Sequence, residues 1–217
     1  MPHVLQPHVF CLLSYSNISN TIKKYLDCGS KILDFGSGPC DKTAVIQSLG
    51  YKCSAFDDLQ DDWHLEDNNK EKIINFVKDF NIDFRLASNG YLPFEKESFD
   101  MVMLHDVLEH LHDSPRELLN DLAELIKPNG LLFITVPNDI NIRKRLAVLM
   151  GKTNLPNFAT YYWYPGPWRG HVREYVKNDL KMLCEFLGFK INELHSCHHM
   201  LSLSKNSKPA VLRFVSS

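Results

Sequence analysis

Three histidines stand where a substrate proton could be accepted. His105 follows an apolar run, His110 lies in the segment Leu-Glu-His, and His171 follows a segment dense in aromatic residues. An imidazole has a pKa near neutrality, so it can serve a hydroxyl nucleophile as a general base. A histidine taken alone is more often structural, and that interpretation stays open for each. His171 is the first candidate, because it lies between the aromatic segment and the next predicted helix.

A glycine turn follows the first strand-like run. Residues 31–35 lead into Gly36-Ser-Gly38-Pro-Cys40, and Asp57-Asp58 end the next apolar run. Glycines let the backbone approach a ligand closely, and a carboxylate at the end of the second strand can accept both ribose hydroxyls of an adenosine. Each aspartate alone fits a loop carboxylate or a helix cap. The combination indicates a nucleotide-like ligand.

The dinucleotide fingerprint G-x-G-x-x-G requires a third glycine where this chain has Asp41, which argues against NAD. Asp34 ends the first strand before the glycines. An acidic residue there suits a cationic ligand, and Asp34 could orient the turn and face the amino group of a sulfonium amino acid.

The elements that would position these residues alternate as in a parallel sheet covered by helices. Strands are predicted at 31–35, 51–56, 82–87, 99–104, 131–136 and 189–194, and helices at 17–27, 41–49, 69–80, 114–126, 140–150 and 178–187. The pattern predicts an α/β fold with a doubly wound, mostly parallel sheet, in a single domain over residues 1–217.

Composition excludes several other classes. The 217 residues are 44% hydrophobic and carry a net charge of −2, which is typical of a globular domain. No apolar run approaches the ~20 residues of a membrane span, and no signal peptide is recognisable. Six cysteines without C-x-x-C pairs fit a reducing compartment, so we expect a cytoplasmic protein. The balanced charge argues against a nucleic-acid partner.

Charge is uneven along the chain. Residues 1–127 carry −9 and residues 128–217 carry +7. A basic second half could favour an anionic substrate. Uneven partitioning over a solvated surface explains it equally simply.

Residues 31–137 resemble the core of class I S-adenosylmethionine-dependent methyltransferases, and four segments carry the resemblance. They are KILDFGSGPC (31–40), FDD (56–58), LPFEKESFDMVMLHDVLEHL (92–111) and LIKPNGLLFITVPN (125–138). The last two are the most specific, and they are shared by many small-molecule methyltransferases with the Leu-Glu-His motif, including quinone-ring enzymes. Segment 170–191 is similar to the region after the fifth strand in those enzymes. The chain departs from the family pattern at one point: the third glycine of the first motif is replaced, and Pro39-Cys40 stand in that stretch.

The resemblance implies S-adenosylmethionine as cofactor and assigns roles by position. The residues implied to bind it are Asp34, Gly36 and Gly38 at the methionine part, Asp57 at the ribose with Asp58 beside it, Ser88 and Asn89 at the adenine, and Leu104 and His105 on the methionine side. Family members often have Asp where Asn89 stands.

Some similar quinone-type O-methyltransferases use a divalent cation held by acidic residues and a histidine. Asp106, Glu109 and His110 occupy those positions here, with Asp106 replacing Glu. A second ligand-rich group comprises His195, Cys197, His198 and His199, and it lacks the paired spacing of a zinc site. We expect no bound metal.

Residues 138–172 are interpreted as an insertion over the active site. Within it, residues 151–170 concentrate proline, glycine and aromatic residues, among them Trp168. The alternative interpretation is that this segment is a hydrophobic plug that covers an edge of the sheet. The two interpretations are compatible with each other.

The end of the sheet is ambiguous. Only residues 210–215 could form a seventh strand, and Val211, Leu212 and Val215 also fit helical spacing. We expect the last strand to be incomplete, which would leave an edge prone to self-association.

The sequence predicts an S-adenosylmethionine-dependent methyltransferase acting on a small molecule or glycan, by O-methylation. A non-catalytic methyltransferase-like binding module and a Rossmann oxidoreductase are the alternatives. No integral membrane segment is expected, and oligomeric state is not predicted.

Overall fold

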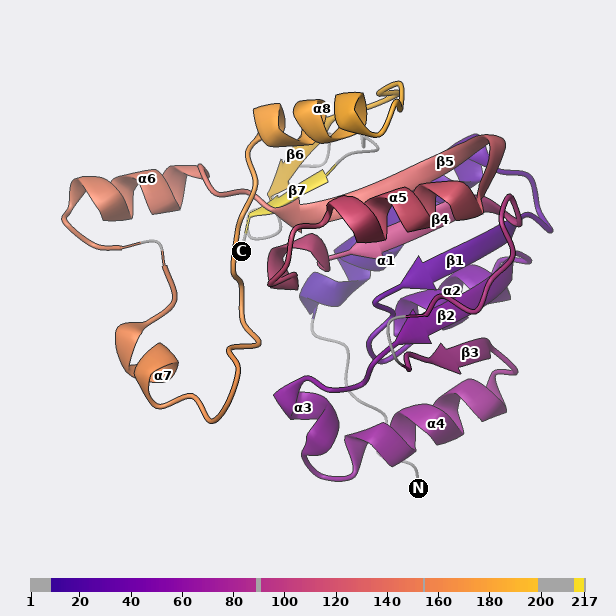
Figure 1. The fold of residues 1–217 in the computed structure, drawn as a ribbon, viewed down its shortest axis with the longest axis horizontal. Helices are drawn as coiled ribbons and strands as arrows, with labels where there is room; N and C mark the ends of the chain where they lie inside the picture. The colour runs from indigo at the N-terminus through magenta and orange to yellow at the C-terminus, as the bar shows by residue number, and fades with distance from the viewer. Residues whose placement is uncertain (1–8, 89–90, 154, 199–212, 217) are drawn as a thin grey trace.

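The computed structural model describes residues 9–88, 91–153, 155–198 and 213–216 (Figure 1). The strands are β1 (Lys31–Phe35), β2 (Lys52–Asp57), β3 (Asp83–Leu86), β4 (Phe99–His105), β5 (Ile126–Pro137), β6 (His195–His198) and β7 (Arg213–Ser216). The helices are α1 (Val9–Tyr25), α2 (Asp41–Ser48), α3 (Asp62–Leu65), α4 (Asn69–Asp79), α5 (Arg116–Leu125), α6 (Ile142–Leu149), α7 (Phe158–Tyr162) and α8 (Lys177–Phe186), with a 3-10 turn η1 (Leu108–His110).

The strands form one sheet in the order β3-β2-β1-β4-β5-β7-β6, and every neighbouring pair is parallel. The predicted α/β fold with a doubly wound sheet is confirmed. The chain runs outward from β1 in both directions, so β1 and β4 are neighbours although α2, β2, α4 and β3 separate them in sequence. Such a reversal of strand order is where ligands bind in open α/β sheets.

Alternating residues of the central strands face two separate cores. Val102 and Leu104 of β4 pack with α5, on the face that α8 also covers. Met101 and Met103 pack on the opposite face, against α1 and α2. Because both faces are covered, most residues of the inner strands are apolar.

The C-terminal end of the sheet differs from the expectation. Arg213–Ser216 pairs with β5 on one side and with β6 on the other, so the prediction of an incomplete last strand is wrong. β7 pairs with Thr135, Val136 and Pro137 of β5, and β6 forms the outer edge of the sheet, so the edge differs from the one on which the expected self-association rested. β6 begins at His195, not at Phe189, because Phe189, Ile191 and Leu194 are used for packing against the core.

Between β5 and α8 the chain leaves the body of the domain. α6 and α7 lie beyond the end of the sheet, at the left of Figure 1, and neither contains a buried residue. The chain then returns past the ends of the strands to α8. No helix in the part of the chain that the structure describes is long and apolar enough to cross a membrane.

Candidate functional site

A cavity of about 960 Å³ lies at the carboxyl ends of β1, β2 and β4. Gly36, Asp57 and His105 line it from the three strand ends. Tyr164 and Trp168 line it from the segment that returns after α7. The volume lies at the upper end of the range for small-molecule and cofactor sites.

The turn after β1 has a left-handed backbone at alternate residues. Gly36 has φ 70°, Gly38 has φ 53° and Cys40 has φ 59°. A Cβ on Gly36 would lie 2.4 Å from Cγ2 of Val107, so a side chain there is excluded by contact as well as by backbone conformation. Cys40 adopts the conformation that glycine favours, so the turn forms despite the replaced third glycine.

Asp57 holds this turn in place. Its Oδ2 accepts a hydrogen bond from the Gly38 N–H at 2.7 Å, and its Oδ1 accepts one from the Leu59 N–H at 2.7 Å. Burial raises the pKa of Asp57, and these two backbone donors oppose that rise. The carboxylate therefore connects the ends of β1 and β2 at the wall of the cavity.

Asp34 lies behind the turn, not at the cavity wall. It is 2% exposed and accepts a hydrogen bond of 2.6 Å from the Thr43 hydroxyl of α2. Burial raises its pKa to about 6. Its contact fixes the start of α2 against β1, so it can influence a ligand through the turn.

Asp58 and Asp61 pair with one arginine. Nη2 of Arg169 lies 3.1 Å from Asp58 Oδ2 and 2.9 Å from Asp61 Oδ1. Close by, the hydroxyl of Tyr164 donates to Asp62 at 2.9 Å. These contacts attach the returning segment to α3. Sequence reasoning predicted neither α3 nor these pairs, since partners so far apart in the chain leave no local signal.

His64 of α3 is a further cavity-lining residue that the sequence did not suggest. It is 2% exposed, and its Nδ1 accepts from the Asp61 N–H at 3.2 Å. Burial lowers its pKa.

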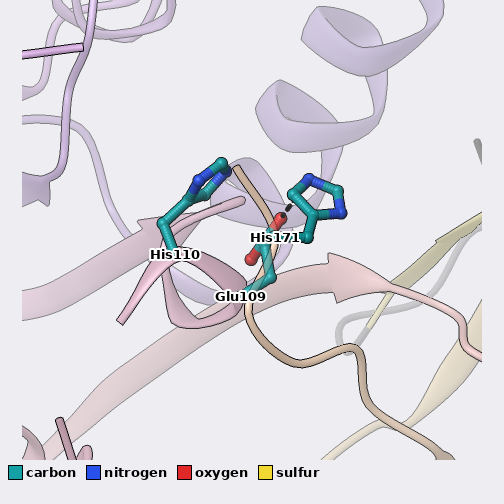
Figure 2. Close-up of side chains that lie close together, drawn as sticks. All are labelled: Glu109, His110 and His171. Atoms are coloured by element: carbon teal, nitrogen blue, oxygen red, sulfur yellow. Dashed lines mark ion pairs between the residues drawn. The ribbon is translucent and has the colours of Figure 1, made fainter. Parts of the chain in front are cut away.

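Two of the predicted catalytic histidines lie side by side. The rings of His110 and His171 are 4.9 Å apart, and both are drawn in Figure 2. Nδ1 of His110 lies 2.9 Å from the carbonyl oxygen of Arg169, and Nδ1 of His171 lies 3.2 Å from Glu174 Oε1. Each oxygen can accept the Nδ1 proton, so in the neutral form of either ring Nδ1 is the donor and Nε2 the acceptor. His110 lines the cavity, with His171 behind it.

Glu109 completes this cluster. Its side chain is fully buried, and neither carboxyl oxygen has a hydrogen-bond partner among the described residues. Burial, and then the charge of Asp106, raise its pKa to about 8. Oε1 lies 4.0 Å from Nε2 of His171, whose pKa is lowered by burial and by the nearby His110 and Lys144. At neutral pH the cluster therefore contains a protonated carboxyl facing a neutral imidazole.

The same three side chains could hold a divalent cation. Glu109, His110 and His171 each offer one ligand atom, and these atoms lie within 4.8 Å of one another. The third possible metal ligand is therefore His171 and not Asp106. Oδ1 of Asp106 instead accepts a hydrogen bond of 3.3 Å from the Thr135 hydroxyl.

The remaining predicted residues are spread over the cavity, the core and the surface. His105 lines the cavity, with Nδ1 3.2 Å from Thr135 Oγ1. Leu104 is fully buried in the core and cannot line the methionine side directly, because alternate residues of β4 face opposite sides of the sheet. Ser88 is exposed beyond β3, and Asn89 lies outside the described residues. In the second ligand-rich group, His199 also lies outside the described residues. Nε2 of His195 lies 3.8 Å from Oε2 of Glu193.

Comparison with known proteins gives one family. The model of a methyltransferase domain matches residues 9–194. An uncharacterised methyltransferase of Schizosaccharomyces pombe is 33% identical over 52% of this chain and 41% of its own length. The human mitochondrial ubiquinone biosynthesis O-methyltransferase is 30% identical over 57% of this chain and 33% of its own length. The chain thus spans less than half of either relative.

A solved SAM-dependent methyltransferase from Methanosarcina mazei has the same fold, with a TM-score of 0.55 and 16% identity over 76% of this chain and 82% of the other. The YcgJ protein from Bacillus subtilis aligns with a TM-score of 0.57 and 16% identity over 83% of this chain and 71% of its own.

The close contact at Gly36 leads to a first prediction. Gly36→Ala should lower the free energy of unfolding by about 1–3 kcal/mol more than Gly188→Ala, because the added methyl overlaps Val107. Gly188 has nearly the same φ, 71°, but no neighbour within 4 Å of an added Cβ, so it isolates the cost of backbone strain. Urea denaturation of both variants checks this; equal losses would show that the contact with Val107 is unimportant.

Buried Glu109 predicts a dependence of stability on pH. Between about pH 4.5 and 8 the unfolded chain has released a proton that folded Glu109 retains, so stability falls as pH rises through this window. Glu109→Gln cannot titrate. The stability of this variant relative to the wild type should therefore rise through the window, by roughly 4–5 kcal/mol in total, since each unit of pKa shift corresponds to about 1.4 kcal/mol.

Thermal unfolding at several pH values measures this difference, and the exposed Glu124→Gln is the control. A gain from Glu109→Gln that stays constant with pH would contradict the assignment.

Proposed function

The chain belongs to the methyltransferase-domain family, whose methyl donor is S-adenosylmethionine, and we propose that it methylates a hydroxyl group of a small molecule or glycan. The observation that carries the proposal is the cavity at the carboxyl ends of β1, β2 and β4, bordered by a turn that excludes a side chain at Gly36. The name of the human relative, an O-methyltransferase, supports oxygen as the methyl acceptor.

The residues around the turn fit the cofactor. Gly36 and Gly38 leave backbone exposed to the cavity, and Asp57 and Asp58 place carboxylates where ribose hydroxyls could donate. Asp34 would act by holding the turn, since it is not exposed to the cavity.

Three further assignments complete the proposed cofactor site. His105 would contribute to the methionine side, with Leu104 supporting it from the core. Ser88 and Asn89 are proposed near the adenine on the strength of the resemblance alone.

The bound cofactor supplies a methyl group already activated on a sulfonium. The protein then has to orient the substrate oxygen in line with that methyl and exclude water. Tyr164 and Trp168 cover one side of the cavity and are held over it by the ion pairs of Arg169 with Asp58 and Asp61. This supports the assignment of residues 138–172 as a substrate-covering insertion.

His110 is the proposed proton acceptor. It lines the cavity and keeps Nε2 as an acceptor, because its Nδ1 donates to Arg169. His171 lies behind it and is oriented by Glu174. The sequence ranked His171 first; its position makes it a supporting member of the cluster. His105 faces Thr135 and is the third candidate.

A divalent cation is a second use of the cluster, favoured by the two unpartnered oxygens of Glu109. Glu109, His110 and His171 would hold it. The cation would supply Lewis-acid activation of a substrate oxygen.

The cofactor is tested by thermal shift and calorimetry. S-adenosylmethionine or S-adenosylhomocysteine should raise the melting temperature, whereas NAD should not. Asp57→Ala should weaken cofactor binding by ~1–3 kcal/mol, the scale of hydrogen bonds to a charged group. The exposed Asp79→Ala on α4 is the control. Stabilisation by NAD instead would favour the oxidoreductase alternative, and unchanged affinity would remove Asp57 from the ribose role.

The proton acceptor is tested by release of S-adenosylhomocysteine over a panel of hydroxylated substrates. His110→Gln should lower turnover by about 10²–10⁴-fold, the usual contribution of a general base, while cofactor affinity stays unchanged. His195→Gln, on β6, is the control.

A chelator separates the two uses of the cluster. If a chelator abolishes activity and a divalent cation restores it, the cluster binds a cation. If the chelator has no effect on activity, the cluster acts through His110 as the general base. Cofactor binding without turnover on any substrate would favour the binding-module alternative.

A further inference from the structure

The segment between β5 and α8 exposes an unusual amount of apolar surface. We define residues 140–168, which include α6 and α7, as the arm. Of the nineteen exposed large hydrophobic side chains among the described residues, eleven lie in it: Ile140, Ile142, Leu146, Val148, Leu149, Met150, Leu155, Phe158, Tyr161, Tyr162 and Trp163. Soluble monomers rarely expose apolar patches of this extent without a partner.

Most of the large apolar residues of α6 and its C-cap lie on one face, with Val148 outside it. Ile142, Leu146, Leu149 and Met150 recur at the spacing of a single helical face, and all are more than half exposed. No part of the described domain covers this face, and α6 lies apart from the sheet (Figure 1). Its surface must therefore find a partner outside the domain or remain in water.

Aromatic side chains extend the apolar surface onto α7. Phe158 is 75% exposed and Trp163 is 78% exposed. Phe158 and Trp163 each contact Tyr162, with ring centroids 5.9 Å and 4.8 Å away. Tyrosine and tryptophan combine an apolar ring with a polar tip, which suits the boundary between lipid and water.

The charge of the arm specifies the kind of partner. Residues 140–168 contain no Asp or Glu and four basic residues. Lys144 pairs with Glu174, whereas Arg145 and Lys152 are exposed. A cationic surface disfavours a second arm as the partner, because like charges would be brought together. An apolar face flanked by arginine and lysine is typical of helices that lie in the interface of anionic membranes.

We propose that the arm docks the protein onto the surface of an anionic lipid bilayer. α6 and α7 would lie in the headgroup region, with their apolar residues in the outer acyl layer and Arg145 and Lys152 against lipid phosphates. Tyr164 and Trp168, which line the cavity, belong to the same arm. Docking would therefore bring the cavity mouth close to the membrane surface.

The test is co-sedimentation of the full chain with lipid vesicles, which requires neither cofactor nor substrate. Vesicles of phosphatidylcholine with about one-third phosphatidylglycerol should retain the protein, and pure phosphatidylcholine should retain about tenfold less or lower still. Raising NaCl to about 0.5 M should weaken binding, since it screens the charge attraction. Retention by neither kind of vesicle would overturn the proposal.

Variants with matched controls locate the contact. Leu149→Asp should reduce vesicle affinity by about tenfold or more, whereas Phe186→Asp, similarly exposed on α8, should have no effect. Arg145→Glu with Lys152→Glu should abolish the preference for anionic vesicles, and Lys181→Glu should retain it. Circular dichroism confirms that each variant is folded.

Light scattering tests whether the arm instead contacts a second copy of the chain. A dimer in solution that Leu149→Asp dissociates, with no vesicle binding by the wild type, would assign the arm to a second copy of the chain and overturn the proposal.

Discussion

The hydrogen bond of 2.7 Å that the Gly38 N–H donates to Asp57 joins the two strands on which the cavity depends. Before this point the N–H groups of Gly36 and Ser37 already donate to the carbonyl oxygen of Phe56 in β2, and the bond from Gly38 to Asp57 extends that attachment further into the turn. This bond helps to fix the turn, in which residues 36, 38 and 40 have left-handed backbone conformations. In this conformation Gly36 packs closely against Val107 in the loop after β4. The sheet places the ends of β1, β2 and β4 side by side, and the Asp57 carboxylate and the absent side chain at Gly36 fix the turn against them.

The sequence predicted the part of the fold that local patterns determine. The first strand, 31–35, has the same bounds as β1, and the helix after the glycine turn differs by a single residue, because apolar runs and glycine stops define both. The sixth strand was misplaced, since Phe189 and Ile191 satisfy an apolar pattern by packing while the paired backbone begins later. α3 was missed, because so short a helix has no recognisable periodicity.

For the site, the sequence indicated residue types but not their contacts. It selected His110 and His171 as separate candidates, and only the fold shows that their rings touch. Glu109 and His110 are adjacent, yet the η1 turn directs one into the interior and the other to the cavity. Whether a carboxyl is buried without a partner depends on the elements packed around it, so the raised pKa of Glu109 had no signature in the local sequence.

Arg169 has a consequence for the order of events during a reaction cycle. Its guanidinium pairs with Asp58 and Asp61 beside the proposed ribose position, while its backbone oxygen accepts the Nδ1 proton of His110. On the proposed site roles, a ligand that competes for Asp58 would remove one of the two carboxylates that hold the Arg169 side chain, while Asp61 would remain. Binding of a nucleoside beside Asp58 would thereby reach the proposed proton acceptor His110 through the peptide unit of Arg169. The two ligands would then bind in sequence, with the second meeting a cavity wall already adjusted by the first.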